Sequence, residues 1–187
     1  GISNFRGWRI AEAVRIADGL GMARPTVCQP YYNLLNRMPE VEILPACANY
    51  GIGVVPYSPV ARGVLAGKYK PGQKPTEGTR AARQDKRLMQ TEWREESLVV
   101  AQKIAEYIEG KDISMVQFAA AWVLANPIIN SVIAGPRTLE QWQGYRGALD
   151  YPWTSADEDF IDSLVVPGHA STPGYHDPQY PFFGRPL

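Results

Sequence analysis

The sequence predicts a parallel α/β fold. Three short apolar runs, at 26–29, 52–57 and 131–134, have the length of buried strands. Stretches with helical periodicity separate these runs, and strands that alternate with helices usually pair in parallel. Gly1 and Ile2 read as the end of a further strand, so we expect the chain to begin in mid-fold. A closed barrel and an open, doubly wound sheet would both fit this order.

The first helix and strand are predicted over 8–18 and 26–29. Ile10, Val14 and Ala17 recur at helical spacing, and Asn4 is a candidate cap for this helix. The run at 26–29 follows a proline and precedes another, which favours a short buried strand.

The second helix is predicted over 40–50 and the next strand over 52–57. Pro45 is expected in the first turn of this helix, and Gly51 is a candidate cap just past its end. The apolar residues of 52–57 are continuous, as in a parallel strand covered by helices. Residues 58–90 are rich in Gly, Pro, Lys and Arg, and we expect them to form a long functional loop.

Four more helices are predicted. Two extend over 92–109 and 114–125, one begins at Thr138, and the last begins at Ser155 and ends near Leu164. Three pairs have the spacing of a capping box, in which side chains three residues apart bond the backbone of a helix start: Ser114 and Gln117, Thr138 and Gln141, Ser155 and Glu158. The segment 166–187 is rich in Pro, Gly and aromatic residues, so we expect an irregular tail after one domain at 1–165.

Composition excludes several functions and leaves a soluble, cytoplasmic protein as the expectation. Nineteen Lys and Arg balance nineteen Asp and Glu, so no overall charge favours nucleic acid or an anionic membrane. No apolar run approaches the roughly 20 residues that span a bilayer. Cys28 and Cys47 lie in apolar segments, which indicates small buried side chains rather than a disulfide or a metal site.

Four motifs then occur in a fixed order along the chain. They are Gly1-Ile2-Ser3-Asn4-Phe5; Gln29 followed by Tyr32-Asn33-Leu34-Leu35-Asn36-Arg37; Tyr57-Ser58-Pro59-Val60-Ala61-Arg62-Gly63-Val64-Leu65-Ala66-Gly67-Lys68-Tyr69; and Gly135-Pro136-Arg137-Thr138-Leu139-Glu140-Gln141. Together they resemble the aldo-keto reductase family. The resemblance implies a (β/α)8 TIM barrel, with this chain forming its C-terminal half, strands five to eight, and NADP(H) bound at the carboxyl ends of the strands.

The resemblance implies that Ser3, Asn4 and Gln29 bind the nicotinamide carboxamide and that Tyr57 stacks on the ring. Hydroxyl and amide groups suit a carboxamide, and an aromatic face suits a flat ring. The alternatives are helix capping for Ser3 and Asn4, a loop hydrogen bond for Gln29 and packing at the barrel rim for Tyr57.

Phosphate contacts are expected from the long loop, whose segment 62–87 holds eight basic and two acidic residues. By the resemblance the pyrophosphate contacts are Ser58, Pro59, Val60, Gly63, Lys68 and Arg80. A solvated loop is the alternative, and it is the preferred interpretation for Lys70, Lys74, Lys86 and Arg87.

The last motif is expected to hold the adenosine 2′-phosphate. Gly135 leads into it, and Arg137 and Thr138 stand at a helix amino terminus, where backbone N–H groups and the helix dipole favour a phosphate. Gln141 lies near the adenosine in the family, and plain capping is the alternative for Thr138 and Gln141. The sequence departs from the family pattern at Gly144 and Tyr145, so Tyr145 is a candidate to stack on adenine.

No catalytic residue and no metal ligand are assigned. Family members reduce aldehydes or ketones with a tyrosine, lysine, histidine and aspartate from the first half of the barrel. His169 and His176 lie in the tail, where surface or packing roles are expected. Tail aromatics could border a substrate pocket or simply pack on the barrel: Tyr175, Tyr180, Phe182 and Phe183.

The expected function is NADP(H)-dependent reduction of a small-molecule carbonyl substrate, with the first half-barrel supplied outside this chain. Two alternatives remain: a non-catalytic NADPH-binding regulatory subunit, and a structural half-barrel that pairs with a second copy as a homo-oligomer.

Overall fold

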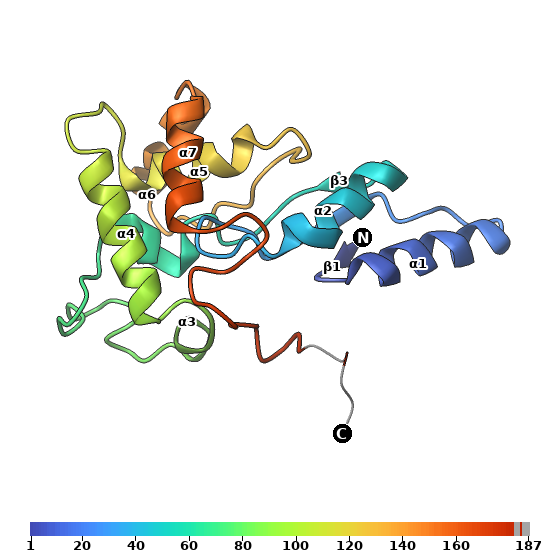
Figure 1. Ribbon diagram of the computed structural model, residues 1–187, viewed down its shortest axis with the longest axis horizontal. Helices are drawn as coiled ribbons and strands as arrows, with labels where there is room; N and C mark the ends of the chain where they lie inside the picture. The colour runs from blue at the N-terminus through green and yellow to red at the C-terminus, as the bar shows by residue number, and fades with distance from the viewer. Residues whose placement is uncertain (182–183, 185–187) are drawn as a thin grey trace.

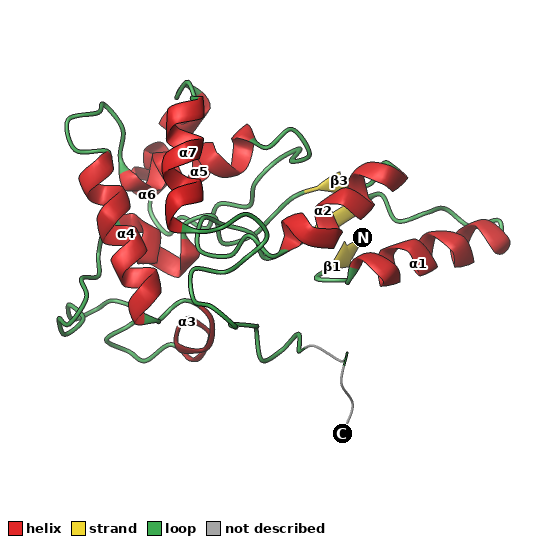
Figure 2. Ribbon diagram, in the orientation of Figure 1, coloured by secondary structure: helices red, strands yellow, loops and turns green. Residues whose placement is uncertain are grey.

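A three-stranded parallel sheet organises the computed structural model, which describes residues 1–181 and 184 (Figures 1 and 2). The strands β1 (Ile2–Ser3), β2 (Val27–Gln29) and β3 (Gly53–Val54) lie in the order β1-β2-β3. In the register Ser3 pairs with Gln29, and Cys28 pairs with both Ile2 and Val54. The parallel α/β prediction is therefore confirmed, although each strand is shorter than its apolar run.

The helices α1 (Gly7–Gly19) and α2 (Pro39–Tyr50) connect these strands and pack on each other at the same end of the molecule (Figure 1). Ile10, Val14 and Ala17 of α1 are buried, as their spacing predicts. Gly51 ends α2 with φ of 65°, the left-handed conformation of a glycine cap.

A fourth segment lies parallel beside β3, but it is not a strand. Isolated bridges join Val54 to Ile129 and Tyr57 to Ile133. The segment predicted as a strand at 131–134 therefore runs parallel, as expected, but it does not form a regular strand. The reason is local: the Val54 N–H donates to the side-chain Oδ1 of Asn130 at 2.7 Å, which takes the place of a backbone carbonyl.

The remaining helices gather at the other end of the molecule (Figure 1). They are α3 (Lys86–Thr91), α4 (Glu95–Tyr107), α5 (Met115–Ala125), α6 (Leu139–Arg146) and α7 (Ser155–Leu164), with 3-10 turns η1 (Ala61–Ala66) and η2 (Gly147–Leu149). Phe118 and Trp122 of α5 are buried in a hydrophobic core that also includes residues of α1, α2 and the sheet. Within the described chain, no helix is both long and apolar enough to cross a membrane.

Several predicted helix starts are corrected. Arg6, not Asn4, precedes α1, and its side chain makes no cap. The second helix begins at Pro39, so Pro45 lies inside it rather than in its first turn. At α7 the capping box is formed one residue earlier, by Thr154 and Asp157.

The other two predicted boxes differ from each other. Ser114 and Gln117 form the full reciprocal box at α5. At α6, Thr138 accepts the N–H of Gln141 at 3.2 Å, but the Gln141 side chain accepts the N–H of Arg137 instead.

The loop predicted at 58–90 contains η1 and α3, and is therefore more ordered than its composition indicates. Arg87 is a correction: it is not a solvated loop residue but pairs from α3 with the buried Asp177 of the tail at 2.6 Å. The described part of the tail after Leu164 has turns and no helix, as expected. Phe182 and Phe183 lie outside the described residues.

Candidate functional site

A pocket of about 490 Å³ opens where the end of β3, the long loop and the start of α6 meet. Ten of the fourteen residues expected to bind a cofactor line it: Tyr57, Ser58, Pro59, Val60, Gly63, Lys68, Arg80, Gly135, Arg137 and Gln141. Thr138 caps α6 beside the pocket without lining it. The structure therefore brings together, from three separate segments, most of the residues that were expected to bind the phosphates.

The wall formed by 58–63 has an unusual backbone. Ser58, Ala61 and Arg62 all have φ between 47° and 60°, although none of them is glycine. Gly63 follows with φ of 101°, where a side chain would be strained. Such conformations tend to cluster at ligand-binding loops.

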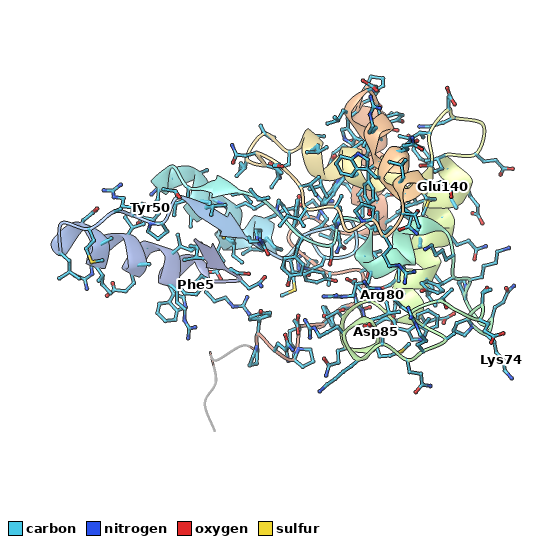
Figure 3. The ribbon with its side chains drawn as sticks, turned by 180° about the vertical axis from the view of Figure 1, so that it is seen from behind. Phe5, Tyr50, Lys74, Arg80, Asp85 and Glu140 are labelled. Atoms are coloured by element: carbon cyan, nitrogen blue, oxygen red, sulfur yellow. The ribbon has the colours of Figure 1, made fainter. Side chains whose placement is uncertain are left out.

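Three basic side chains reach this pocket from different directions. Lys68 follows η1, Arg80 comes from the long loop, and Arg137 precedes α6. Among the residues that the structure describes, none of the three takes part in an ion pair, so their charges are available to an anion. Figure 3 shows Lys74 at the outer end of the long loop, while Arg80 lies nearer the body of the molecule.

The amino-terminal part of α6 and the residues just before it form another part of the pocket wall. The Gln141 side chain accepts the backbone N–H of Arg137 at 2.8 Å. This bond holds the backbone of Arg137 in place at the root of its side chain. One turn later, Gly144 and Tyr145 also line the pocket, at the positions where the sequence departs from the family pattern. Tyr145 is half-buried, and this burial raises the pKa of its hydroxyl above its ordinary value.

The remaining three residues form a hydrogen-bonded set at the carboxyl ends of β1 and β2. The Ser3 hydroxyl donates to the Gln29 carbonyl at 2.8 Å, and the Asn4 amide donates to Ser3 Oγ at 3.1 Å. The same amide lies 3.3 Å from the Tyr57 hydroxyl, so Asn4 connects this set to the pocket. The side chain of Gln29 is exposed. In this set Gln29 takes part through its backbone carbonyl, which accepts the bond from Ser3, and not through its side chain.

Asn4 holds this position through an uncommon backbone conformation, with φ of 52°. Its Oδ1 accepts the N–H of Tyr31 at 2.9 Å, which ties β1 to the segment after β2. Tyr57 stacks at a tilt against Tyr31, with ring centroids 5.6 Å apart. Burial raises the pKa of Tyr57, so its hydroxyl stays protonated at neutral pH.

The prediction missed several residues that line the pocket, among them Arg62, Tyr69, Thr79, Ser114 and Ile133. Arg62 and Tyr69 lie within a motif that had been identified, and Ser114 had been given only a capping role. Thr79 could not be found from the sequence, because the path of a long loop depends on tertiary contacts.

Catalytic and metal candidates are few. Within residues 1–181 and 184, no group of three or more His, Cys, Asp or Glu could hold a metal ion. His169 is exposed, with its Nδ1 3.0 Å from the Pro167 carbonyl, and His176 is exposed as well. Cys28 and Cys47 are both buried and free, as expected.

Parallel strands whose carboxyl ends border a basic pocket are typical of α/β proteins that bind phosphorylated ligands. The comparison with known proteins agrees: the chain matches the Aldo/keto reductase family over residues 1–166, and it belongs to that family.

Three relatives illustrate the range of proteins to which the chain is similar. The uncharacterized oxidoreductase YrpG of Bacillus subtilis (strain 168) is 33% identical over 96% of this chain and 51% of its own length. The probable voltage-gated potassium channel subunit beta of Arabidopsis thaliana is 34% identical over 80% of this chain and 46% of its own length. Versiconal hemiacetal acetate reductase of Aspergillus parasiticus is 32% identical over 89% of this chain and 48% of its own length.

The chain thus spans about half the length of the curated relatives it matches. A partial α/β arrangement with a three-stranded parallel sheet is consistent with that share of a larger fold.

Proposed function

We propose that the pocket binds NADP(H), and that this chain is the cofactor-binding half of a (β/α)8 barrel enzyme that reduces aldehydes or ketones. The observation that supports this most directly is the meeting of Lys68, Arg80 and Arg137 around one pocket that has Tyr57 in its wall. Three cations suit a ligand with several phosphates, and an aromatic face suits a flat ring.

The described side chains fit such a cofactor from one end to the other. Lys68 and Arg80 would bind the pyrophosphate, together with the glycine-containing turn at 58–63. Arg137 would bind the 2′-phosphate, at the amino terminus of a helix whose dipole also favours an anion. Ser3, Asn4 and Gln29 would orient the carboxamide, with Asn4 joining them to Tyr57.

The cofactor, when bound, supplies a hydride to the carbonyl carbon of the substrate. The residues of this chain bind and orient it: Tyr57 would cover one face of the nicotinamide ring, leaving the other face for the substrate. A proton for the carbonyl oxygen would come from residues outside this chain, as the resemblance to the family implies.

The test is a fluorescence titration of the full-length protein with NADPH and NADH. Arg137→Met should weaken NADPH binding about 10- to 100-fold, because a charge-assisted bond contributes about 1.5–3 kcal/mol. The affinity for NADH, which lacks the 2′-phosphate, should change far less. Arg146→Met is the matched control, since it changes the same residue type at the end of α6, the helix that follows Arg137, and lies outside the pocket.

Two results would count against this assignment. If the wild type binds neither nucleotide, the pocket does not serve this cofactor. If Arg137→Met weakens the binding of NADPH and of NADH equally, Arg137 does not bind the 2′-phosphate.

A second candidate is a cofactor-binding regulatory subunit. The similarity to the plant proteins named probable voltage-gated potassium channel subunit beta favours it. Binding of NADPH without turnover of any aldehyde or ketone would support this candidate over the enzyme.

A further inference from the structure

The short helix α3 contacts both the wall of the pocket and the tail. At its start, Asp85 caps the helix by accepting the N–H of Leu88 at 3.0 Å. The backbone N–H of the same Asp85 donates to the carbonyl of Arg80, also at 3.0 Å (Figure 3). Arg80 is one of the three basic residues that line the pocket, so the residue that begins α3 also holds the backbone of a pocket residue.

The other end of α3 contacts a second residue of the pocket wall. The buried hydroxyl of Thr91 accepts the Nε–H of Arg62 at 3.3 Å. Arg62 lines the pocket and has φ of 52° within the turn at 58–63. Both ends of α3 are therefore bonded to residues that line the pocket.

Arg87, near the start of α3, binds the tail. Its Nη1 and Nη2 donate to the two carboxylate oxygens of Asp177, at 3.1 and 2.6 Å. The side chains of Arg87 and Asp177 are only 23% and 8% exposed. A two-point ion pair of this kind has a fixed geometry, and removing one partner from a buried pair is costly. Asp177 therefore fixes the position of α3 relative to the tail.

The tail is itself attached on both sides of Asp177. The carbonyl of Asp177 accepts the N–H of Tyr180 at 2.9 Å, which forms a turn. The carbonyl of Tyr180 in turn accepts a bond from the Arg6 guanidinium at 3.0 Å, next to α1. Before the turn, Arg94 of the segment ahead of α4 donates to Thr172 Oγ1 at 2.7 Å. This part of the tail can therefore act as a fixed support for α3.

We propose that Asp177 is a positioning residue for the bound cofactor, which through Arg87 and α3 holds Arg80 at the phosphates and so slows cofactor release. The inference rests on the proposed function, in which Arg80 binds the pyrophosphate. Neither Asp177 nor Arg87 lines the pocket, so the effect passes along the bonds of α3 and needs no contact with the cofactor.

Charge and position predict different outcomes when the pair is broken. Asp177→Asn removes a negative charge, and Arg87→Met removes a positive one. If the pair acted only through its electric field on the phosphates, the two variants would change cofactor binding in opposite directions. If the pair positions α3, both variants free the helix and both speed release.

The test measures the rate constant of NADPH release from the full-length protein by stopped-flow fluorescence, with excess NADP+ as the trap. Asp177→Asn and Arg87→Met should each speed release about five- to tenfold, because breaking a buried charge pair acts mainly on dissociation. Glu96→Gln is the control. It removes a different carboxylate that contacts the tail, at Thr172, and should leave the release rate unchanged.

Two double variants test the route of the effect. Asp177→Asn combined with Arg87→Met should release NADPH no faster than the faster single variant, because both changes break the same bond. In a protein that already carries Arg80→Met, Asp177→Asn should speed release by less than about twofold, since the contact it positions is gone. A general loss of structure would speed release equally with and without Arg80.

Three results would overturn the positioning role while leaving the proposed function standing: wild-type release rates in both single variants, opposite changes in the two, or an undiminished effect of Asp177→Asn in the Arg80→Met protein. If one single variant does not fold, the other tests the same ion pair from its opposite side. A wild type that binds no NADPH would refute the proposed function, and this inference with it.

Discussion

Asp157 is the side chain whose replacement should change the stability of this fold most clearly. It is 1% exposed at the start of α7, and its carboxylate accepts hydrogen bonds from four side chains and one backbone N–H around it. Oδ1 accepts from Tyr107 at 3.0 Å, Lys111 at 2.8 Å and Tyr151 at 3.2 Å. Oδ2 accepts from the backbone N–H and the hydroxyl of Thr154, at 3.1 and 2.6 Å.

Asp157→Asn keeps the shape of the side chain but removes its charge. It also replaces one accepting oxygen with an NH2 group, which donates hydrogen bonds, while the neighbouring groups also donate. Removing one partner from a buried charged network costs about 3–5 kcal/mol. The side chain of Lys111 is 34% exposed, so water can solvate part of its charge after the substitution. We therefore expect a loss at the lower end of this range, about 3 kcal/mol of unfolding free energy.

Urea unfolding of the full-length protein, followed by tryptophan fluorescence, measures this loss. Trp153 lies close by, with its Nε1 donating to Glu158 at 2.8 Å, and should report the unfolding of this region. Asp159→Asn, at an exposed position of the same helix, is the control and should change the stability by less than about 0.5 kcal/mol.

The effect should also depend on pH. Burial opposes ionisation of Asp157, but the bonds from Lys111, Thr154 and Tyr107 outweigh it and hold the pKa well below its usual value. A lowered pKa stabilises the fold above the unfolded value near 4 and loses that contribution as the pH falls further. The difference between wild type and Asp157→Asn should therefore shrink in acid. A loss below about 1 kcal/mol at pH 7, or a difference that grows in acid, would refute this reasoning.

Two further substitutions test the local structure. Ser114→Ala removes the cap of α5 and should lower the unfolding free energy by about 1 kcal/mol in the same urea assay, while an unchanged midpoint would show that the capping box contributes nothing. Gly51→Ala forces a side chain into φ of 65° and should cost about 1–2 kcal/mol, whereas Gly19→Ala, at the end of α1 without positive φ, should be neutral or stabilising; equal effects would contradict the conformational argument.

The sequence predicted well those features that depend on local chemistry. The apolar positions of α1, the glycine cap of α2 and the capping box of α5 each follow from residues within one or two turns of each other. Through the motifs that resemble the aldo-keto reductase family, it also predicted residues from separate segments that line one pocket.

The features it missed depend on contacts between distant residues. The side chain of Asn130 replaces a backbone partner of Val54, so the fourth segment does not become a regular strand. Arg87 finds Asp177 across 90 positions of sequence, and composition alone could not distinguish it from the solvated lysines of its loop. The small pocket lined by Tyr31, Tyr175 and Asp177 depends on the return of the tail to the strand ends, which no local sequence pattern indicates.

The weak attachment of the fourth segment has a consequence for thermodynamic linkage. Two isolated bridges, at Ile129 and Ile133, and the side chain of Asn130 join this segment to β3 and the residues just after it. The segment leads directly into the pocket wall that carries Arg137. Regions with few backbone bonds open at low free energy, and a ligand that contacts both walls opposes that opening. An occupant of the pocket would therefore act as a crosslink between the sheet and α6, and slow the exchange of amide hydrogens in a part of the chain that it does not touch.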